Sequence, residues 1–290
     1  MLACQLALFM FLCEMLGMGI IMSELVNGNL LIIGGAEDKW GQSSVLKNAI
    51  DMCGDGEAKI IVLTTATQKP QEVGEEYRAV FTRLGVKYID ILNVDSRNDA
   101  NNDSVVQRIA GAAGVFFTGG DQLRITSILG GTKTFKTLLD MHKQGIPIIG
   151  TSAGASAMSS TMIVDGNSNS AARKCTLGMS PGLGFLEHVI IDQHFEQRGR
   201  LGRLLVGVAQ NPSILGVGID EDTAIKVNSN TSFEVVGTNC VTVIDGTTIQ
   251  KSNVSELNPE EIIALSNVTI HVLPSGFRFD LNKRTVSEVI

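Results

Sequence analysis

Short apolar runs alternate with longer amphipathic stretches along this chain of 290 residues, from residue 30 onward. The amphipathic stretches at residues 72–84 and 135–143 carry apolar side chains at helical spacing, with charged residues between them. The apolar runs lead into turn-forming residues and lie at residues 30–33, 59–63, 88–92, 114–117 and 146–149. This alternation predicts βαβ units, and hence an α/β fold with a doubly wound, mostly parallel sheet covered by helices.

The second half of the chain changes character after one more βα pattern. A strand is predicted at residues 189–191, a helix at residues 200–210 that Asn211-Pro212 ends, and a strand at residues 214–219. Residues 224–272 alternate more like antiparallel hairpins, and Asp245-Gly246 predicts a two-residue hairpin turn among them. We therefore expect an antiparallel β extension at the C-terminal end of the parallel sheet.

The length and the 44% hydrophobic content allow one large core, so residues 23–290 are predicted to form a single domain. Residues 1–22 are a separate apolar extension whose one charge is Glu14. They could be a secretion signal, a membrane anchor, or a stretch that precedes the true start at Met22. No Lys or Arg precedes the apolar run, and no small-residue cleavage site follows it, which favours the late start and a cytoplasmic protein. Secretion or membrane anchoring stays open at this point.

Composition excludes several classes of function. The net charge of −7 argues against general nucleic-acid binding, which requires a basic face. The five cysteines have no CxxC spacing and suit a reducing compartment, and the four histidines form no ligand-like pair, so no metal site is predicted. Gly34-Gly35 follows a predicted strand but lacks both the Gly-x-Gly-x-x-Gly spacing and a Walker lysine, so no nucleotide cofactor is expected.

The most informative motif is Gly-Thr-Ser-Ala-Gly at residues 150–154, directly after a predicted strand. It fits the Gly-x-Ser-x-Gly nucleophile elbow, in which small neighbours let the backbone turn sharply and expose the serine. Ser152 is therefore the candidate nucleophile. The free N–H of Ala153 at the start of the next helix, together with those of Gly119 and Gly120 at another strand end, are candidate oxyanion donors.

A serine nucleophile needs a general base and an acid that orients it. His194 is the best candidate base, because it follows the strand at residues 189–191 where an open α/β sheet places its site. His142, His188 and His271 are most simply surface or packing residues. The acid could be Asp192, Glu196 or Glu221, and the residue pattern does not choose between them.

A cluster of arginines lies close to His194 in this acidic chain. Arg198, Arg200 and Arg203 present guanidinium groups that match carboxylates, and Asp192 and Glu196 supply the opposite charge nearby. Basic residues at a helix start oppose the helix dipole, so a functional role is favoured over a structural one. The mixture suits a substrate that carries both carboxylate and guanidinium groups.

These motifs together resemble the cyanophycinases, in the family of serine peptidases that also contains aspartyl dipeptidases. The resemblance spans residues 30–243 and rests on four segments. They are Ile-Ile-Gly-Gly-Ala-Glu-Asp-Lys at residues 32–39, Phe-Thr-Gly-Gly-Asp-Gln at residues 117–122, Gly-Thr-Ser-Ala-Gly-Ala at residues 150–155, and Asp-Gln-His-Phe-Glu-Gln-Arg-Gly-Arg-Leu-Gly-Arg-Leu at residues 192–204. The last block is rare and makes the resemblance specific.

The resemblance implies a flavodoxin-like fold similar to that of class I glutamine amidotransferases. It implies hydrolysis of cyanophycin, a poly-aspartate backbone with arginine on each β-carboxyl, to β-Asp-Arg dipeptides from the carboxyl end. It assigns the triad to Ser152, His194 and Glu221, and it implies a homodimer without cofactors. The substrate contacts that it implies are Gln122, Asp192, Gln193, Arg198, Arg200 and Arg203.

Two departures and two rival functions remain. The extension at residues 1–22 is not part of the family pattern, and residues 165–170 lie where relatives carry more acidic side chains. One rival is an aspartyl dipeptidase-like exopeptidase with another substrate, and the other is a non-catalytic binding protein of the same fold. A cysteine-dependent amidotransferase is disfavoured, because the elbow carries Ser152 in place of cysteine.

Overall fold

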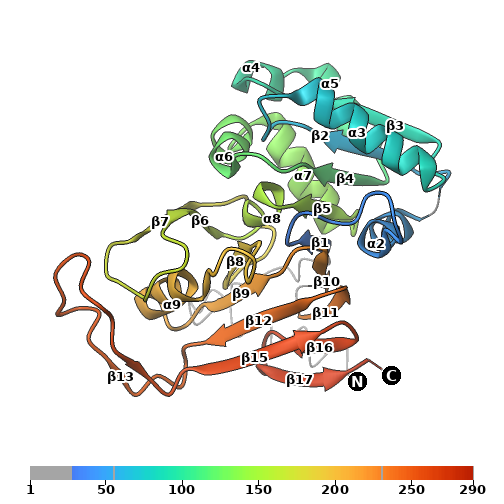
Figure 1. Ribbon diagram of the computed structural model, residues 1–290. Coiled ribbons are helices and arrows are strands. Elements are labelled where there is room, and N and C mark those ends of the chain that lie inside the picture. The colour runs from blue at the N-terminus through green and yellow to red at the C-terminus, as the bar shows by residue number, and fades with distance from the viewer. Residues whose placement is uncertain (1–27, 55, 230, 290) are drawn as a thin grey trace, which may run out of the picture.

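The computed structural model describes residues 28–54, 56–229 and 231–289, so the apolar extension at residues 1–22 lies outside the described residues. Among the residues described, no helix is both long enough and apolar enough to cross a membrane. The chain forms a mixed α/β structure with one large and one smaller β-sheet (Figure 1).

Five parallel strands make up one side of the large sheet, from its edge to its middle. Their order from the edge to the middle is β3 (Tyr88–Leu92), β2 (Lys59–Leu63), β4 (Gly114–Phe117), β5 (Ile148–Thr151) and β1 (Asn29–Ile33). The five predicted strands are confirmed. β5 begins after Pro147 and extends to Thr151, so the strand runs directly into the predicted elbow.

Helices cover both faces of these strands. α2 (Ser44–Cys53) and α3 (Pro70–Arg83) pack on one face, and α5 (Asp103–Ala110), α6 (Gln122–Leu129) and α7 (Lys133–Lys143) pack on the other (Figure 1). α4 (Arg97–Ala100) is a single capped turn before α5. The largely parallel, doubly covered central sheet is therefore the one that the sequence pattern predicted.

Strand periodicity explains how one sheet serves two cores. In β1, Leu31 and Ile33 face the α2 and α3 side, while Leu30 and Ile32 face the opposite side, and all four side chains are fully buried. Successive strand residues point to opposite faces, so a strand buried on both sides is continuously apolar. Each such side chain contributes about 1.5–3 kcal/mol relative to an exposed one, which fixes the sheet that carries the site.

Antiparallel strands extend the large sheet beyond β1. They are β10 (Thr223–Asn228), β11 (Ser232–Gly237), β16 (Phe277–Asp280) and β17 (Thr285–Glu288). The smaller sheet has the order β15 (Thr269–Pro274), β12 (Cys240–Asp245), β9 (Leu215–Ile219) and β8 (Val189–Gln193), and α9 (Leu201–Gln210) packs on it. Within it β8 and β9 are parallel, whereas the other two pairs are antiparallel.

The remaining described elements are short. A hairpin of β6 (Thr161–Gly166) and β7 (Leu177–Pro181) follows the small helix α8 (Ala153–Ser156). β13 (Lys251–Ser252) and β14 (Leu265–Ser266) form a two-stranded ribbon in the C-terminal part.

The predicted two-residue hairpin at Asp245-Gly246 is wrong. β12 ends at Asp245, but its partners are β9 and β15, so no strand returns directly beside it. The Asp245 carboxylate accepts hydrogen bonds from the Thr247 amide (2.8 Å) and hydroxyl (2.7 Å) and pairs with Arg284. Gly246 packs so closely that a Cβ there would come within 2.7 Å of Val208. These side-chain contacts turn the chain away, as Asx turns do.

The strand order brings three loops to one place. β5 lies between β1 and β4, so the elbow after β5 is flanked by Gly34-Gly35 after β1 and Gly119-Gly120 after β4. The parallel pair β8 and β9 delivers His194 and Glu221 from two neighbouring strand ends. Ligands of open α/β sheets bind at such carboxyl ends, and the site described below lies there.

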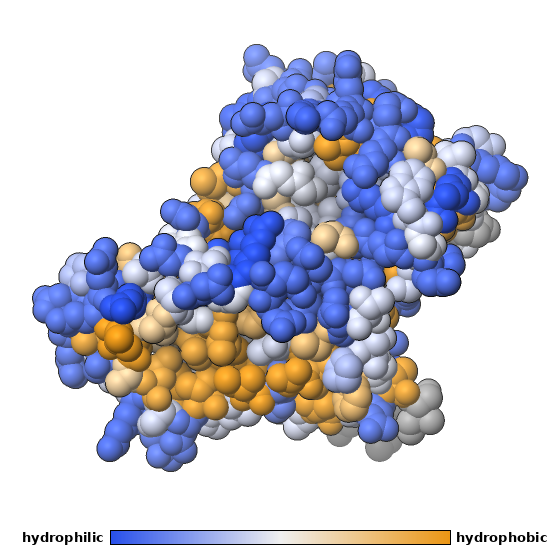
Figure 2. Space-filling view, in the orientation of Figure 1, coloured by the Kyte–Doolittle hydropathy of each residue, from blue (hydrophilic) through white to orange (hydrophobic). Residues whose placement is uncertain are grey.

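An apolar strip covers part of the C-terminal layer. Figure 2 shows hydrophobic residues gathered over β12 and β15, where Ile270 is 46% and Val272 is 62% exposed. Both side chains belong to β15, an edge strand of the smaller sheet. Exposed apolar surface on an edge strand is characteristic of contact surfaces between chains.

Candidate active site

Ser152 lies on the sharp strand-to-helix turn that the elbow motif predicted. Its φ of 53° and ψ of −111° are rarely adopted by a residue with a side chain, and its N–H donates to the Ile33 carbonyl at 3.0 Å. A Cβ on Gly150 would come within 2.6 Å of the Gly154 backbone, and one on Gly154 within 2.6 Å of the Phe117 carbonyl oxygen. Both glycines of the motif are therefore required by the close packing of this turn.

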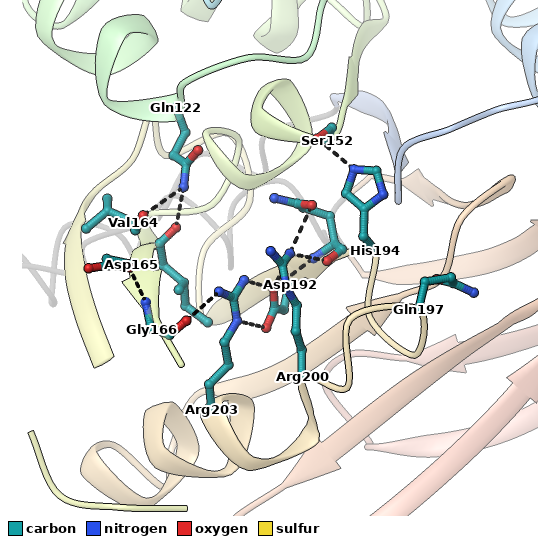
Figure 3. A network of polar contacts seen from close by, with 12 residues as sticks. Gln122, Ser152, Val164, Asp165, Gly166, Asp192, His194, Gln197, Arg200 and Arg203 are labelled. Carbon is teal, nitrogen blue, oxygen red and sulfur yellow. Dashed lines mark hydrogen bonds and ion pairs between the residues drawn. The ribbon is translucent and has the colours of Figure 1, made fainter. Parts of the chain in front are cut away.

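The structure brings Ser152, His194 and Glu221 into one chain of hydrogen bonds. Ser152 Oγ lies 3.0 Å from His194 Nε2, and His194 Nδ1 lies 2.6 Å from Glu221 Oε1 (Figure 3 shows the first of these contacts). A carboxylate can only accept, so Nδ1 carries the proton and Nε2 is left to accept from the serine hydroxyl. This tautomer is the one that general-base chemistry requires.

The other two candidate acids do not reach the imidazole. The Asp192 carboxylate is fully buried and pairs with Arg200 and Arg203, and Glu196 is exposed with its N–H donating to Asp220. Glu221 is instead fixed by Gln197, whose Oε1 accepts the Glu221 N–H at 3.0 Å. Gln197 lies within the segment of residues 192–204 that carries the resemblance, but the residue pattern predicts no role for it.

Burial dominates the electrostatics of His194, which is 8% exposed. Loss of solvation lowers the pKa of the imidazole below its usual value. The hydrogen bond and negative charge of Glu221 oppose this effect, while the positive charges of Arg198 and Arg200 add to it. The His194 imidazole is therefore neutral at pH 7 and able to accept a proton.

The Gly34-Gly35 loop cradles His194, a contact that the sequence analysis missed. The Gly34 carbonyl accepts the His194 N–H at 2.8 Å. Gly35 has a φ of 99°, and a Cβ there would lie 2.4 Å from the imidazole ring. The glycine pair follows a predicted strand and lies in a segment that carries the family resemblance, but neither signal indicates a contact with His194.

The predicted oxyanion donors lie around the serine. A Cβ on Gly119 would lie 3.4 Å from Ser152 Cβ, so this glycine borders Ser152 directly. The N–H groups of Gly119, Gly120 and Ala153 donate to no acceptor within residues 28–54, 56–229 and 231–289. Three N–H groups without an acceptor among the described residues therefore lie on the Gly119-Gly120 loop and at the residue after Ser152.

Two of the three arginines are held inside the protein. Arg203 Nε donates to Asp192 Oδ2 at 2.7 Å, and Arg200 donates to the Gln193 side chain at 3.1 Å and to the Gln193 carbonyl (Figure 3). Burial lowers the pKa of Arg200 to about 10, although Asp192 opposes this shift. Asp192 offsets the cost of placing cations at the start of α9.

Two predicted substrate-contact residues remain, Gln122 and Arg198, and only the Gln122 side chain already has hydrogen-bond partners within the described part of the protein. The Gln122 amide group donates to the carbonyls of Ile163 (2.9 Å) and Val164 (3.4 Å) in β6, which ties α6 to that hairpin (Figure 3). The Arg198 N–H donates to the His194 carbonyl at 3.1 Å, but its exposed side chain makes no hydrogen bond or ion pair with any residue that the structure describes. Its guanidinium is therefore the one cation of this block left open to a ligand.

Comparison with known proteins identifies the family. Residues 30–235 match the model of peptidase family S51. The chain belongs to peptidase family S51. A cyanophycinase from Nostoc sp. is 35% identical over 258 residues, which cover 89% of this chain and 87% of the relative. A cyanophycinase from Geminocystis herdmanii is 33% identical over 265 residues, covering 91% and 97%.

The resemblance to the cyanophycinases is thus confirmed, and this S51 chain is a serine peptidase. A solved peptidase structure from an acI-B1 Actinobacterium superposes with a TM-score of 0.64 at 21% identity, covering 88% of this chain and 97% of the other. That likeness shows a shared fold. Among the described residues of this S51 peptidase, no group of three or more His, Cys, Asp or Glu side chains could hold a metal ion.

Proposed function

We propose that this S51 peptidase hydrolyses cyanophycin, or a related β-aspartyl peptide, from the carboxyl end and releases β-Asp-Arg dipeptides. The observation that carries the proposal is the hydrogen-bonded chain of Ser152, His194 and Glu221 beside the open guanidinium of Arg198. Relatives that are 33–35% identical over most of their length are cyanophycinases, which supports the substrate. We also propose that the fold is of the flavodoxin-like, class I glutamine-amidotransferase type, and that the chain acts as a homodimer.

In the proposed mechanism His194 removes the proton from Ser152 as Oγ attacks the carbonyl carbon of an aspartyl unit. The tetrahedral oxyanion is held by the N–H groups of Ala153, Gly119 and Gly120. His194 then gives the proton to the leaving amine, and an acyl-enzyme remains on Ser152. Water, deprotonated by the same imidazole, attacks this ester and regenerates the serine, while Glu221 stabilises the imidazolium in both halves.

Substrate recognition follows from the charges that remain open. Arg198 is proposed to pair with the terminal carboxylate of the chain being shortened, because it is exposed and unpaired within the described residues. Arg200 hydrogen-bonds to Gln193, and Arg203 hydrogen-bonds to Asp192. These four buried residues are therefore held in place without a bound substrate. The Gln122 side chain holds α6 against β6 through its hydrogen bond to the Ile163 carbonyl.

Arg198→Gln is expected to raise KM for cyanophycin by about 10- to 100-fold with a smaller effect on kcat, because a charge-assisted bond contributes about 1.5–3 kcal/mol. Steady-state kinetics on soluble β-Asp-Arg oligomers measure this change. Arg278→Gln removes the same charge from β16 and is the matched control. Equal KM values for both variants would contradict the assignment of Arg198.

The pH profile follows from the lowered pKa of His194. The neutral imidazole is the active base, so kcat/KM should rise with pH through a single apparent pKa below the usual 6.5 and then reach a plateau. Arg198→Gln should move this rise to higher pH, since the positive charge of Arg198 lowers the His194 pKa. A midpoint above 7 in the unmodified protein would contradict His194 as the base.

The nearest rival is a peptidase of the aspartyl dipeptidase type, which shares the elbow and the triad. Comparing rates on branched polymer and on α-Asp-x dipeptides separates the two. We expect soluble product from the polymer and little cleavage of the α-linked dipeptides. The reverse preference would favour the dipeptidase function.

A further inference from the structure

A buried carboxylate that takes no part in the proposed triad lies directly behind the nucleophile. Glu37 belongs to the loop after β1 and is only 5% exposed. Its Oε2 accepts the hydroxyl of Thr151 at 2.6 Å, and its Oε1 accepts the hydroxyl of Tyr77. Burial and the negative charge of Glu37 raise the pKa of Tyr77 well above its usual range, so the phenol stays protonated as a donor.

Burying the Glu37 carboxylate costs stability through lost solvation. A buried charge loses several kcal/mol of solvation, and Glu37 has no ion-pair partner among the described residues to offset that loss. Two hydroxyl donors compensate only part of it. Apolar groups of similar shape at all three positions, Glu37, Thr151 and Tyr77, would avoid this desolvation cost, so the contacts made by Glu37 suggest a role beyond stability.

Thr151 indicates that role, because it is the last residue of β5 and the immediate neighbour of Ser152. The strained backbone of Ser152 persists only if the surrounding contacts over-determine it. The Ser152 N–H bond to Ile33 fixes one side of the residue, and the Thr151 hydroxyl bond to Glu37 fixes the peptide that enters it.

The same loop also contacts the segments that carry the other two triad members. The Gly34 carbonyl accepts the His194 N–H at 2.8 Å. Asp222, which follows Glu221, donates its N–H to the Gly35 carbonyl at 2.9 Å and accepts the Asp38 N–H at 2.8 Å. Residues 34–38 therefore touch the nucleophile, base and acid segments together.

We propose that Glu37 is a positioning residue, which holds Ser152 in attack geometry through the Thr151 hydroxyl. This inference rests on the proposed role of Ser152 as the nucleophile. Glu37 does not touch substrate and exchanges no proton in the reaction. Its contribution is to the orientation of Oγ, where misplacement by about 1 Å can cost about 100-fold in rate.

The test compares the two hydroxyls that share this carboxylate. Thr151→Val removes the donor that leads to the nucleophile, Thr151→Ser keeps it, and Tyr77→Phe removes the donor that leads away from it. We measure kcat and KM, the rate at which a serine-directed fluorophosphonate labels Ser152, and the midpoint of thermal unfolding. The labelling rate depends on no peptide substrate.

Thr151→Val is expected to lower kcat and the labelling rate by about 10- to 100-fold with KM nearly unchanged. Thr151→Ser and Tyr77→Phe should both stay within about 3-fold of the unmodified protein, even where Tyr77→Phe lowers the unfolding midpoint.

Two results would overturn the inference. Labelling of Thr151→Val at the unmodified rate would show that the bond does not position Oγ. Equal losses in Thr151→Val and Tyr77→Phe, in proportion to their unfolding midpoints, would show a structural role alone. Failure of the proposed substrate looks different, because Ser152 would then be labelled normally while cyanophycin stays intact. An unlabelled Ser152 in folded protein would instead refute the nucleophile itself.

Discussion

Ser152→Ala is expected to lower kcat on cyanophycin by about 10⁵- to 10⁶-fold while leaving the fold unchanged. The hydroxyl is the group proposed to form the acyl-enzyme, and no other described hydroxyl lies within hydrogen-bonding distance of His194. The residual rate should come from binding and from the free N–H groups around the elbow. Kinetics with mass detection of released dipeptide measure the loss.

Ser156→Ala is the matched control, because it removes a hydroxyl from the short helix that follows Ser152, and Ser156 makes no hydrogen bond to His194. It should retain turnover within about 3-fold, as substitutions outside the reacting groups commonly do. Unfolding midpoints of both variants show whether the fold survives. Turnover that persists in folded Ser152→Ala would refute the nucleophile assignment.

Glu221→Gln is expected to cost about 10⁴-fold in kcat, the second-largest effect. The amide matches the carboxylate in size, but it carries no charge to stabilise the imidazolium, and it can favour the wrong tautomer of His194. The 2.6 Å contact between His194 Nδ1 and Glu221 Oε1 is the observation on which this expectation rests. Single-turnover labelling and steady-state kinetics both report it.

The control for this variant is Glu196→Gln. Glu196 lies two residues from His194 in sequence, yet its carboxylate makes no hydrogen bond to the ring. It should keep kcat within about 3-fold. A larger loss in Glu196→Gln than in Glu221→Gln would reverse the choice of acid.

The strands and the elbow were predictable because their signals are local. Burial on both faces of the sheet makes β1 apolar from Leu30 to Ile33, and the tight turn around Ser152 requires glycine at both Gly150 and Gly154. His194 could be predicted as the base because it follows a strand, and open α/β sheets bind ligands at the carboxyl ends of their strands. This rule requires only the order of helices and strands along the chain.

The acid could not be chosen from the residue pattern, because the choice depends on strand pairing. Glu221 reaches His194 only since β9 lies parallel to β8, whereas Asp192, two residues from His194, faces the arginines. Sequence proximity favoured Asp192 and Glu196, the end of a predicted strand made Glu221 a third candidate, and only the resemblance chose Glu221.

Glu37 and the Asp245-Gly246 turn both show that contacts between distant residues cannot be predicted from the local sequence. Glu37 and Thr151 are 114 residues apart, so nothing in the sequence around either one indicates their bond. Asp245-Gly246 looks like a hairpin locally, but the contacts of Asp245 with Thr247 and Arg284 decide its course. Long-range side-chain pairs decided both cases.

The most direct test of the central claim is mass analysis of soluble products after purified protein is incubated with insoluble cyanophycin. We expect the unmodified chain to release β-Asp-Arg dipeptide and folded Ser152→Ala to release no detectable dipeptide in the same incubation. An intact polymer after incubation with the unmodified chain, or equal dipeptide from Ser152→Ala, would contradict this claim.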